Sequence, residues 1–425
     1  MGKQKLTKLN EAAAFFRGEV KLMEENPVEG GEIQSLTFKA LVELLEDILR
    51  AAEQRDKTIG WYMLGLTPEI LLAMDIFPYC TEMLVLLLPS IQPDGLKEFI
   101  DIGERTGIPP ETCMIDKSML GLMTRDELPR PDFVLGTSLP CDSIVVAYQV
   151  YKKLLPAPFF FLDGPYFGDE RDIDYYANQM KAAIKFVEEQ TGKKMDYDRL
   201  KEIVEEDNRA FEYILEANEL RKAVPCPQSG RLLFLTNFLR KFLAGNPRAT
   251  AIFKKVRDDA KAKAEKGLGA VPEEANRVIW FHIPTFFDLS ILEWMENEFK
   301  AVIAMDMVSY LPLEPIDTST PESIIRGLAI KSLNTPMLRQ FRGPLEFYTD
   351  DLVRVCEDYK ADSVIFAGHL GCKHAWGFSG LVRETCKEMG IPILIFDLDC
   401  FDPSVTPSSI IKEKIAEFFK TLVIQ

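Results

Sequence analysis

The sequence predicts an α/β fold of two Rossmann-like or flavodoxin-like parallel-sheet lobes with a helical insert between them. Short runs rich in β-branched and aromatic residues alternate with helical stretches in residues 56–169 and again in residues 276–425. Residues 170–275 lack strand signals and carry long charged amphipathic segments instead. At 425 residues the chain also exceeds what one hydrophobic core usually supports, so more than one domain is expected.

The N-terminal region, residues 1–55, is predicted to be helical. Apolar residues recur there at mostly three- and four-residue intervals, which is the spacing of one helix face. The residues that set this spacing are Leu36, Leu41, Leu44, Leu45 and Ile48.

The first lobe, residues 56–169, combines strand and helix signals in alternation. Its predicted strands are Thr58–Met63, Phe133–Gly136 and Phe159–Leu162. Its predicted helices include Gly95–Thr106 and Ser143–Leu154. This alternation indicates a parallel sheet that is covered by helices.

The helical segment, residues 170–275, contains the amphipathic stretches Asp196–Arg221 and Leu232–Lys266. The second lobe, residues 276–425, resumes the alternation of strands and helices. Its predicted strands are Arg277–His282, Ala301–Met305, Ser363–Ala367 and Ile391–Phe396. A cleft between two such lobes is a common place for an active site.

Composition and charge exclude several classes of protein. The formal net charge of -16 and the pI of about 4.9 disfavour a nucleic-acid partner, because the protein repels polyanions. The most apolar stretch, around Met83 to Pro89, is far shorter than the roughly 20 residues of a membrane span, and the N-terminus has no apolar signal region. We therefore expect a cytoplasmic protein without a membrane segment.

The eight cysteines are spread along the whole chain, which is too large to need disulfide bonds for stability. They are therefore expected to be reduced thiols or metal ligands. The chain has three histidines, which leaves little material for a histidine-rich zinc or iron site. Sulfur is the expected ligand type.

Two cysteines follow predicted strands and precede predicted helices. They are Cys141, in GTSLPCDS, and Cys372, in FAGHLGCKHAWG. Ligands of open α/β sheets bind beyond the carboxyl ends of the strands, and a helix N-terminus stabilises a thiolate. Cys113 lies in the proline-rich turn TGIPPETCMID, where the backbone is constrained. The alternative is that each thiol is a small buried packing residue, as free cysteines often are.

The other five cysteines have weaker patterns. Cys400 is the main competitor because it also lies just past a predicted strand, although a packing or supporting role is favoured. Cys356 and Cys386 fall within amphipathic helices and are expected to pack in the core. Cys80 and Cys226 lie beside turns without an evident partner.

These motifs resemble a known family over roughly residues 35–425. The third cysteine stands in the loop His369-Leu370-Gly371-Cys372-Lys373-His374, and the second in the context Pro140-Cys141-Asp142. The first follows a proline-containing turn, and Thr67–Pro78 is similar to the Pro-Glu helix opening of the same family. The sequence resembles subunits of 2-hydroxyacyl-CoA dehydratases and benzoyl-CoA reductases, including the larger subunit of lactoyl-CoA dehydratase.

The resemblance implies one [4Fe-4S] cluster held by Cys113, Cys141 and Cys372, with one iron left open. A cubane with three protein ligands keeps one metal corner for water or substrate. The implied reaction removes water from an (R)-2-hydroxyacyl-CoA, such as lactoyl-CoA, through a ketyl radical, and gives a 2-enoyl-CoA.

The same resemblance implies two protein partners. The required low-potential electron needs an ATP-hydrolysing iron-sulfur activator, because the chain contains neither GxxxxGK[ST] nor GxGxxG. Members of this family also work with a homologous second subunit, so a heterodimer is expected.

Further residues have two interpretations each. Glu69 is a candidate acid or base near the cluster, although a first-turn glutamate is also stabilised by the helix dipole. Lys373 and His374 are candidates for contacts to a sulfide or a CoA phosphate, or else solvated groups. His369 is expected to brace its loop and Trp376 to pack in the core. The turn Asp163–Tyr166 is a candidate cleft wall, or a plain turn.

Three alternative functions stay open. A benzoyl-CoA reductase subunit would donate electrons net rather than recycle them. A non-catalytic electron-transfer subunit would leave the working cluster on a partner. A double-cubane reductase would carry about twice the iron per chain.

Overall fold

A computed structural model describes residues 4–27 and 31–424 of the chain. The predicted N-terminal helical region consists of two helices in these residues, α1 (Thr7–Glu25) and α2 (Glu32–Gln54). Residues 1–3 and 28–30 of that prediction lie outside the described residues.

Two four-stranded parallel sheets confirm the predicted α/β fold of two lobes. The first lobe contains β1 (Ile59–Tyr62), β2 (Phe77–Cys80), β3 (Phe133–Thr137) and β4 (Phe159–Leu162), in the order β2-β1-β3-β4. The second lobe contains β5 (Asn276–Trp280), β6 (Ala301–Asp306), β7 (Ser363–His369) and β8 (Ile393–Leu398), in the order β6-β5-β7-β8. Both sheets therefore use the same strand order, and in each the order reverses between the first and third strands.

The structure adds one strand that the sequence patterns did not predict. β2 has only four residues, and one of them is Pro78. A proline cannot donate a backbone hydrogen bond, so it is tolerated only at the edge of a sheet, which is where β2 lies. The proline and the short length together hid this strand from the pattern analysis.

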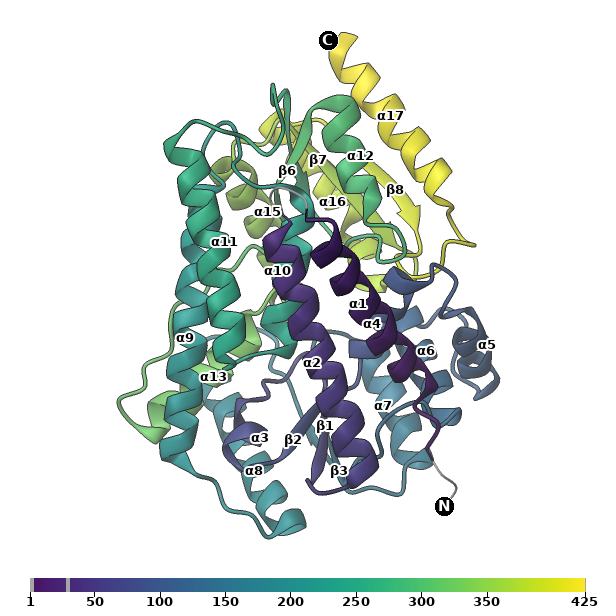
Figure 1. The fold of residues 1–425 in the computed structure, drawn as a ribbon, viewed down its shortest axis with the longest axis vertical. Helices are drawn as coiled ribbons and strands as arrows, with labels where there is room; N and C mark the ends of the chain where they lie inside the picture. The colour runs from purple at the N-terminus through teal and green to yellow at the C-terminus, as the bar shows by residue number, and fades with distance from the viewer. Residues whose placement is uncertain (1–3, 28–30, 425) are drawn as a thin grey trace.

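Helices account for most of the remaining chain (Figure 1). The first lobe adds α3 (Glu69–Ala73), α4 (Met83–Ile91), α5 (Lys97–Arg105), α6 (Met114–Thr124) and α7 (Asp142–Leu154). The segment between the sheets forms α8 (Glu170–Thr191), α9 (Tyr197–Leu220), α10 (Gly230–Phe242) and α11 (Pro247–Glu265). The second lobe adds α12 (Ser290–Phe299), α13 (Pro321–Asn334), α14 (Leu338–Arg342), α15 (Glu346–Asp358), α16 (Lys373–Met389) and α17 (Ser408–Ile424).

The stretch Leu232–Lys266, predicted as one amphipathic segment, is two helices. The side chain of Asn246 accepts a hydrogen bond from the backbone N–H of Arg248, and Pro247 occupies the first turn of α11. An asparagine cap followed by proline is a strong helix start, so the chain ends α10 and begins again. The pattern of apolar residues alone did not reveal this break.

The helical segment packs on both lobes. α9 and α11 run side by side along one flank of the molecule (Figure 1). α8 covers the first sheet, where Phe186 contacts Phe133 of β3 and Phe160 of β4 with ring centroids 6.2 and 5.5 Å apart. The predicted domain boundaries at residues 55, 169 and 275 stay predictions.

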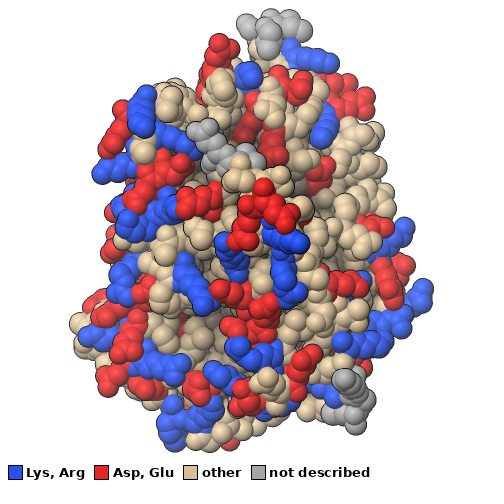
Figure 2. Space-filling view, viewed as in Figure 1, with Lys and Arg blue, Asp and Glu red and all other residues tan. Residues whose placement is uncertain are grey.

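The surface carries both signs of charge. Lysine and arginine side chains are interspersed with acidic ones over the face shown in Figure 2. Within the part of the chain that the structure describes, no helix is both long and apolar enough to span a bilayer.

Candidate cluster site

A cavity of about 310 Å³ lies where strands of both lobes end. It is lined by residues that follow β1 and β3 in the first lobe and β5 and β7 in the second. The strand order reverses between these strands in each sheet, and open α/β sheets bind ligands at such points. The polar and sulfur-containing lining residues are Met63, Glu82, Glu111, Thr112, Cys113, Asp116, Cys141, Asp142, Ser143, His282, Met337, His369, Cys372, Lys373 and His374.

The three predicted cysteines all line this cavity, and each caps the N-terminus of a helix. Cys113 caps α6, Cys141 caps α7 and Cys372 caps α16. These three side chains are half-buried, whereas the other five cysteines are buried. The sequence predicted the helix-capping positions of Cys141 and Cys372, but it did not predict that of Cys113.

The proline-rich turn before Cys113 is fixed from behind by a buried lysine. The Lys117 ammonium donates to the carbonyl oxygen of Pro110 at 2.7 Å and to Glu104 Oε1 at 2.8 Å. The backbone N–H of Thr112 donates to the carbonyl oxygen of Pro109 at 3.0 Å. These contacts hold the turn so that Cys113 is presented at the cavity.

Ser143 links the Cys113 and Cys141 segments of the first lobe. Its hydroxyl accepts a hydrogen bond from the backbone N–H of Cys113 at 3.3 Å and donates to Asp116 Oδ2. Because Ser143 lies in the first turn of α7, two residues after Cys141, it ties the starts of α6 and α7 together.

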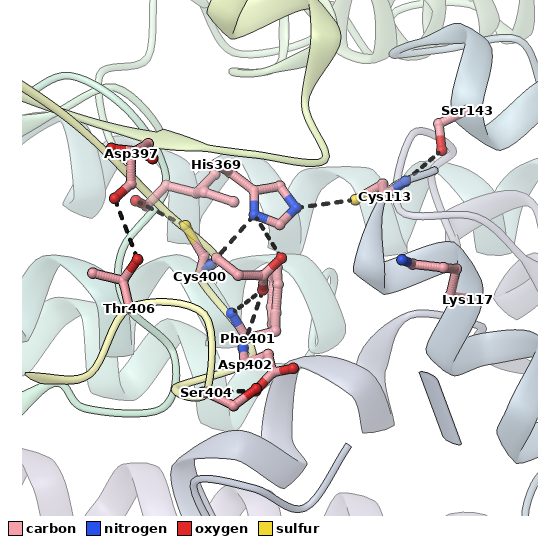
Figure 3. Close-up of polar contacts among 12 residues, drawn as sticks. Cys113, Lys117, Ser143, His369, Asp397, Cys400, Phe401, Asp402, Ser404 and Thr406 are labelled. Atoms are coloured by element: carbon pink, nitrogen blue, oxygen red, sulfur yellow. Dashed lines mark hydrogen bonds and ion pairs between the residues drawn. The ribbon is translucent and has the colours of Figure 1, made fainter. Parts of the chain in front are cut away.

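His369 connects the second lobe to Cys113 (Figure 3). Its Nε2 lies 3.4 Å from Cys113 Sγ, while its Nδ1 accepts from the backbone N–H of Cys400 at 3.3 Å. Since Nδ1 accepts that bond, the ring proton is placed on Nε2, where it faces the sulfur. Asp399 Oδ2 lies 3.5 Å from Nδ1. His369 thus braces its loop, as predicted, and also reaches a sulfur of the first lobe.

Gly371 explains why the His-x-Gly-Cys loop contains a glycine. A Cβ atom at this position would lie 2.8 Å from the Cα of Cys113 and 3.0 Å from His369 Nε2. Cβ atoms do not approach backbone atoms that closely, so only glycine lets the loop after β7 lie against α6. The close approach brings Cys372 and Cys113 to one cavity.

The surroundings of the three thiols disfavour free thiolates. Burial is the main cause that raises the pKa of Cys113, Cys141 and Cys372 above the usual value. Asp116 raises the pKa of Cys113 and Cys141 further, whereas backbone N–H groups in the first helical turns lower the pKa of all three. The thiols are therefore protonated at neutral pH unless a metal binds and displaces the protons.

The donor set fits a thiolate-bound cluster rather than a single metal ion. Across residues 4–27 and 31–424, no three His, Cys, Asp or Glu side chains converge closely enough to share one ion. In a cubane each cysteine binds a different iron, so its sulfur ligands stand further apart than those of one ion. Three half-buried thiols around a cavity match that arrangement.

Two buried groups in the cavity were not singled out in the sequence. Both ring nitrogens of His282 and the Oδ1 atom of Asp116 have no hydrogen-bond partner. Burial raises the pKa of Asp116 to about 7, which is far above the usual value of a carboxyl. The missed signal was position, because His282 directly follows a strand of the second lobe and all three histidines of the chain line this cavity.

The remaining charged candidates lie in different settings. Lys373 and His374 line the cavity, whereas Glu69 is not among its lining residues. The Glu69 carboxylate accepts from the Lys331 ammonium at 2.7 Å, and the same ammonium also donates to Asp207.

The other sequence candidates lie away from the cavity lining or only partly in the core. Cys400 is buried, with Sγ 3.9 Å from the carbonyl oxygen of Ile283. The turn at Asp163 accepts hydrogen bonds from Ser138 at 3.4 Å and Tyr175 at 3.0 Å. Trp376 is half-buried and contacts Phe366 with ring centroids 6.2 Å apart.

Comparisons with known proteins agree with this geometry. A family model described as 2-hydroxyglutaryl-CoA dehydratase, D-component, matches residues 65–422. The alpha subunit of (R)-2-hydroxyglutaryl-CoA dehydratase from Acidaminococcus fermentans is 26% identical over 288 residues, which cover 65% of this chain and 57% of that protein. The (R)-phenyllactyl-CoA dehydratase alpha subunit of Clostridium sporogenes is 23% identical over 367 residues, covering 83% and 86%. One of the subunits of the benzoyl-CoA reductase of Thauera aromatica is 21% identical over 406 residues, covering 87% and 89%.

Proposed function

The chain belongs to the 2-hydroxyglutaryl-CoA dehydratase D-component family, and from this premise we propose that it is the iron-sulfur subunit of an (R)-2-hydroxyacyl-CoA dehydratase. The reaction eliminates water from the acyl-CoA and leaves a 2-enoyl-CoA. The observation that carries the proposal is the convergence of Cys113, Cys141 and Cys372 on one cavity at the carboxyl ends of both sheets.

Cys113, Cys141 and Cys372 hold a [4Fe-4S] cluster as thiolates, with one iron free of protein ligands. Such a cluster supplies single electrons and an open metal position next to the substrate. The three helix N-termini stabilise the negative charge of the sulfurs through their backbone N–H groups. His369 orients Cys113 by its contact with the sulfur.

The lining of the cavity favours a short, apolar acyl group. Its apolar wall includes Met63, Ile144, Ile283 and Phe341, and no arginine stands among the described residues that line it. Lys373 is exposed, so the cavity has no buried cation for a second carboxylate. A volume of about 310 Å³ is near the lower end of known ligand pockets, and the cluster takes part of it. Lactoyl-CoA meets both conditions.

The reaction requires two further proteins. The relatives from Acidaminococcus fermentans and Clostridium sporogenes are named alpha subunits, which supports a second subunit for this chain. The chain has no phosphate-binding GxxxxGK[ST] loop, so a separate ATP-dependent activator delivers the low-potential electron.

Anaerobic purification of the chain with its partner subunit tests the proposal. We expect about four irons and four sulfides per chain, and redox-neutral formation of a 2-enoyl-CoA from (R)-lactoyl-CoA once activator, ATP and reductant are added. (R)-2-hydroxyglutaryl-CoA should react poorly because the cavity offers no buried partner for its second carboxylate.

Other outcomes of the same assay favour other functions. Reduction of the benzoyl-CoA ring would favour a reductase, in line with the similarity to the benzoyl-CoA reductase of Thauera aromatica. An electron paramagnetic resonance spectrum that ignores every acyl-CoA would indicate an electron-transfer subunit. About eight irons per chain would indicate a double cubane.

A further inference from the structure

His282 is a buried polar group without a partner. It follows β5 directly and is fully buried, and neither Nδ1 nor Nε2 makes a hydrogen bond. A buried donor or acceptor left unpaired costs about 1 to 3 kcal/mol, so such groups are rare unless something else satisfies them. Because His282 lines the cavity, the missing partner is a molecule that enters it.

The packing around His282 does not require a polar ring. Its neighbours include Phe341 and Phe366, with ring centroids 6.2 and 5.5 Å away. A phenylalanine would pack between them without an unpaired nitrogen. The imidazole is therefore explained by what it binds and not by how it packs.

His282 is a neutral donor in this setting. Burial is the main cause that lowers its pKa to about 3, with His369 as a second influence. A neutral imidazole carries one N–H donor and one acceptor nitrogen. The side chain can therefore donate a hydrogen bond without bringing a charge into the apolar cavity.

The other buried polar groups of the cavity mainly accept hydrogen bonds. Asp116 Oδ1 is an unpaired carboxyl oxygen, and Glu82 Oε2 already accepts from Thr81 at 2.8 Å and from the backbone N–H of Leu64 at 3.1 Å. The Ser143 hydroxyl already donates to Asp116. Among the described lining residues, His282 is therefore a fully buried donor that is free to serve a carbonyl oxygen.

We infer that His282 contacts the substrate and donates a hydrogen bond from its ring N–H to the thioester carbonyl oxygen of the bound acyl-CoA. This inference rests on the proposed function. The bond fixes the orientation of the thioester in the cavity. It also strengthens as negative charge develops on that oxygen, because a fixed donor in a dry site stabilises such charge without reorganising.

Two ligands that differ only in the carbonyl group test this contact. Propionyl-CoA carries the thioester carbonyl, whereas the thioether S-propyl-CoA lacks it. We expect the anaerobically purified complex to bind propionyl-CoA about tenfold more tightly by calorimetry. His282→Phe should bind both ligands alike, and His282→Gln, which keeps an N–H donor, should recover part of the preference.

Turnover and spectroscopy separate a substrate contact from a contact to the cluster. His282→Phe should keep its iron content and the substrate-free electron paramagnetic resonance spectrum, while kcat/KM for (R)-lactoyl-CoA falls about 100-fold. An altered substrate-free spectrum together with an unchanged carbonyl preference would overturn the inference, because the ring would then face the cluster.

The proposed function and the inference fail in different ways. If the wild-type complex neither binds nor converts any acyl-CoA, the proposed function is wrong. If the wild-type complex does both and His282→Phe behaves in the same way, the function stands and the role of His282 is refuted.

Discussion

The two lobes share one strand order but contribute differently to the cavity. In each lobe, the loop after the third strand ends in a cysteine that caps the next helix, Cys141 on α7 and Cys372 on α16. The loops after the first strands differ, since the first lobe presents Met63 and Leu64 where the second presents His282 and Ile283. Equivalent positions thus carry sulfur ligands in one case and unlike side chains in the other.

The third cysteine has no counterpart in the second lobe. Cys113 comes from the segment between β2 and β3, whereas the equivalent segment between β6 and β7 contributes Met337 and Phe341. The comparison therefore gives a physical basis for three protein ligands and an open iron. Duplicated topology supplies two thiolates, a helix of the first lobe adds the third, and apolar side chains line the cavity from the matching segment of the second lobe.

The largest expected effect comes from the paired cysteines. Cys141→Ser and Cys372→Ser should each lose the cluster and all activity, since either change leaves only two thiolates. Serine is a good helix N-cap, so α7 and α16 should still form. Iron and sulfide analysis of the anaerobically purified variants measures the loss, and circular dichroism checks the fold.

Cys386→Ala is the matched control for these variants. Cys386 is buried in α16 and does not line the cavity, so this variant should keep its iron. Equal iron content in the Cys372→Ser and Cys386→Ala proteins would contradict the ligand assignment. Retention of iron by Cys141→Ser alone would break the equivalence of the two lobes.

A smaller effect is expected where the lobes meet. Gly371→Ala places a methyl group 2.8 Å from the Cα of Cys113, so the loop after β7 must move away from α6. A misplacement of about 1 Å at a reaction centre lowers the rate by about 100-fold. We expect a loss of that order in kcat, with partial loss of iron, measured on the purified complex.

A second glycine in the neighbouring helix provides the comparison. Gly377 lies in α16 with open space around the position of a Cβ atom, so Gly377→Ala should keep full activity and raise stability by about 0.5 to 1 kcal/mol. Equal activity of the two alanine variants would show that the close contact between the lobes is not required.

Local sequence patterns predicted most of the sheet but not its edge. Phe159–Leu162 was predicted with the bounds that the structure has, because an aromatic run stands between Pro158 and a turn at Asp163. β2 was missed because strand propensity is weak in a four-residue segment with Pro78. Its place is fixed by pairing with β1, which is a tertiary contact that no local pattern contains.

The site could be predicted as far as its residues follow strands directly. Cys141 and Cys372 were found because a strand, a loop and a helix are readable in order along the chain. The role of His282 depends on what surrounds it, since its burial and its lack of partners follow from packing across the cavity. The contact between His369 and Cys113 joins residues 256 positions apart, which spacing along the chain cannot show.

The smallest expected effect concerns Glu69, which follows the first strand of the first lobe as His282 follows that of the second. Its catalytic role stays a prediction, but the structure pairs its buried carboxylate with Lys331, which also binds Asp207. Glu69→Gln should lower the free energy of unfolding by about 1 to 3 kcal/mol, because Lys331 loses one charged partner.

Asp207→Asn is the matched variant, since it removes the other partner of the same ammonium. If the two carboxylates serve only to hold Lys331, both variants should shift the denaturant midpoint alike and keep kcat within about twofold of the wild type. A large loss of kcat in Glu69→Gln alone would mean that Glu69 acts in the reaction. In that case the first strands of both lobes would deliver reacting groups, and the contrast between His282 and Glu69 would disappear.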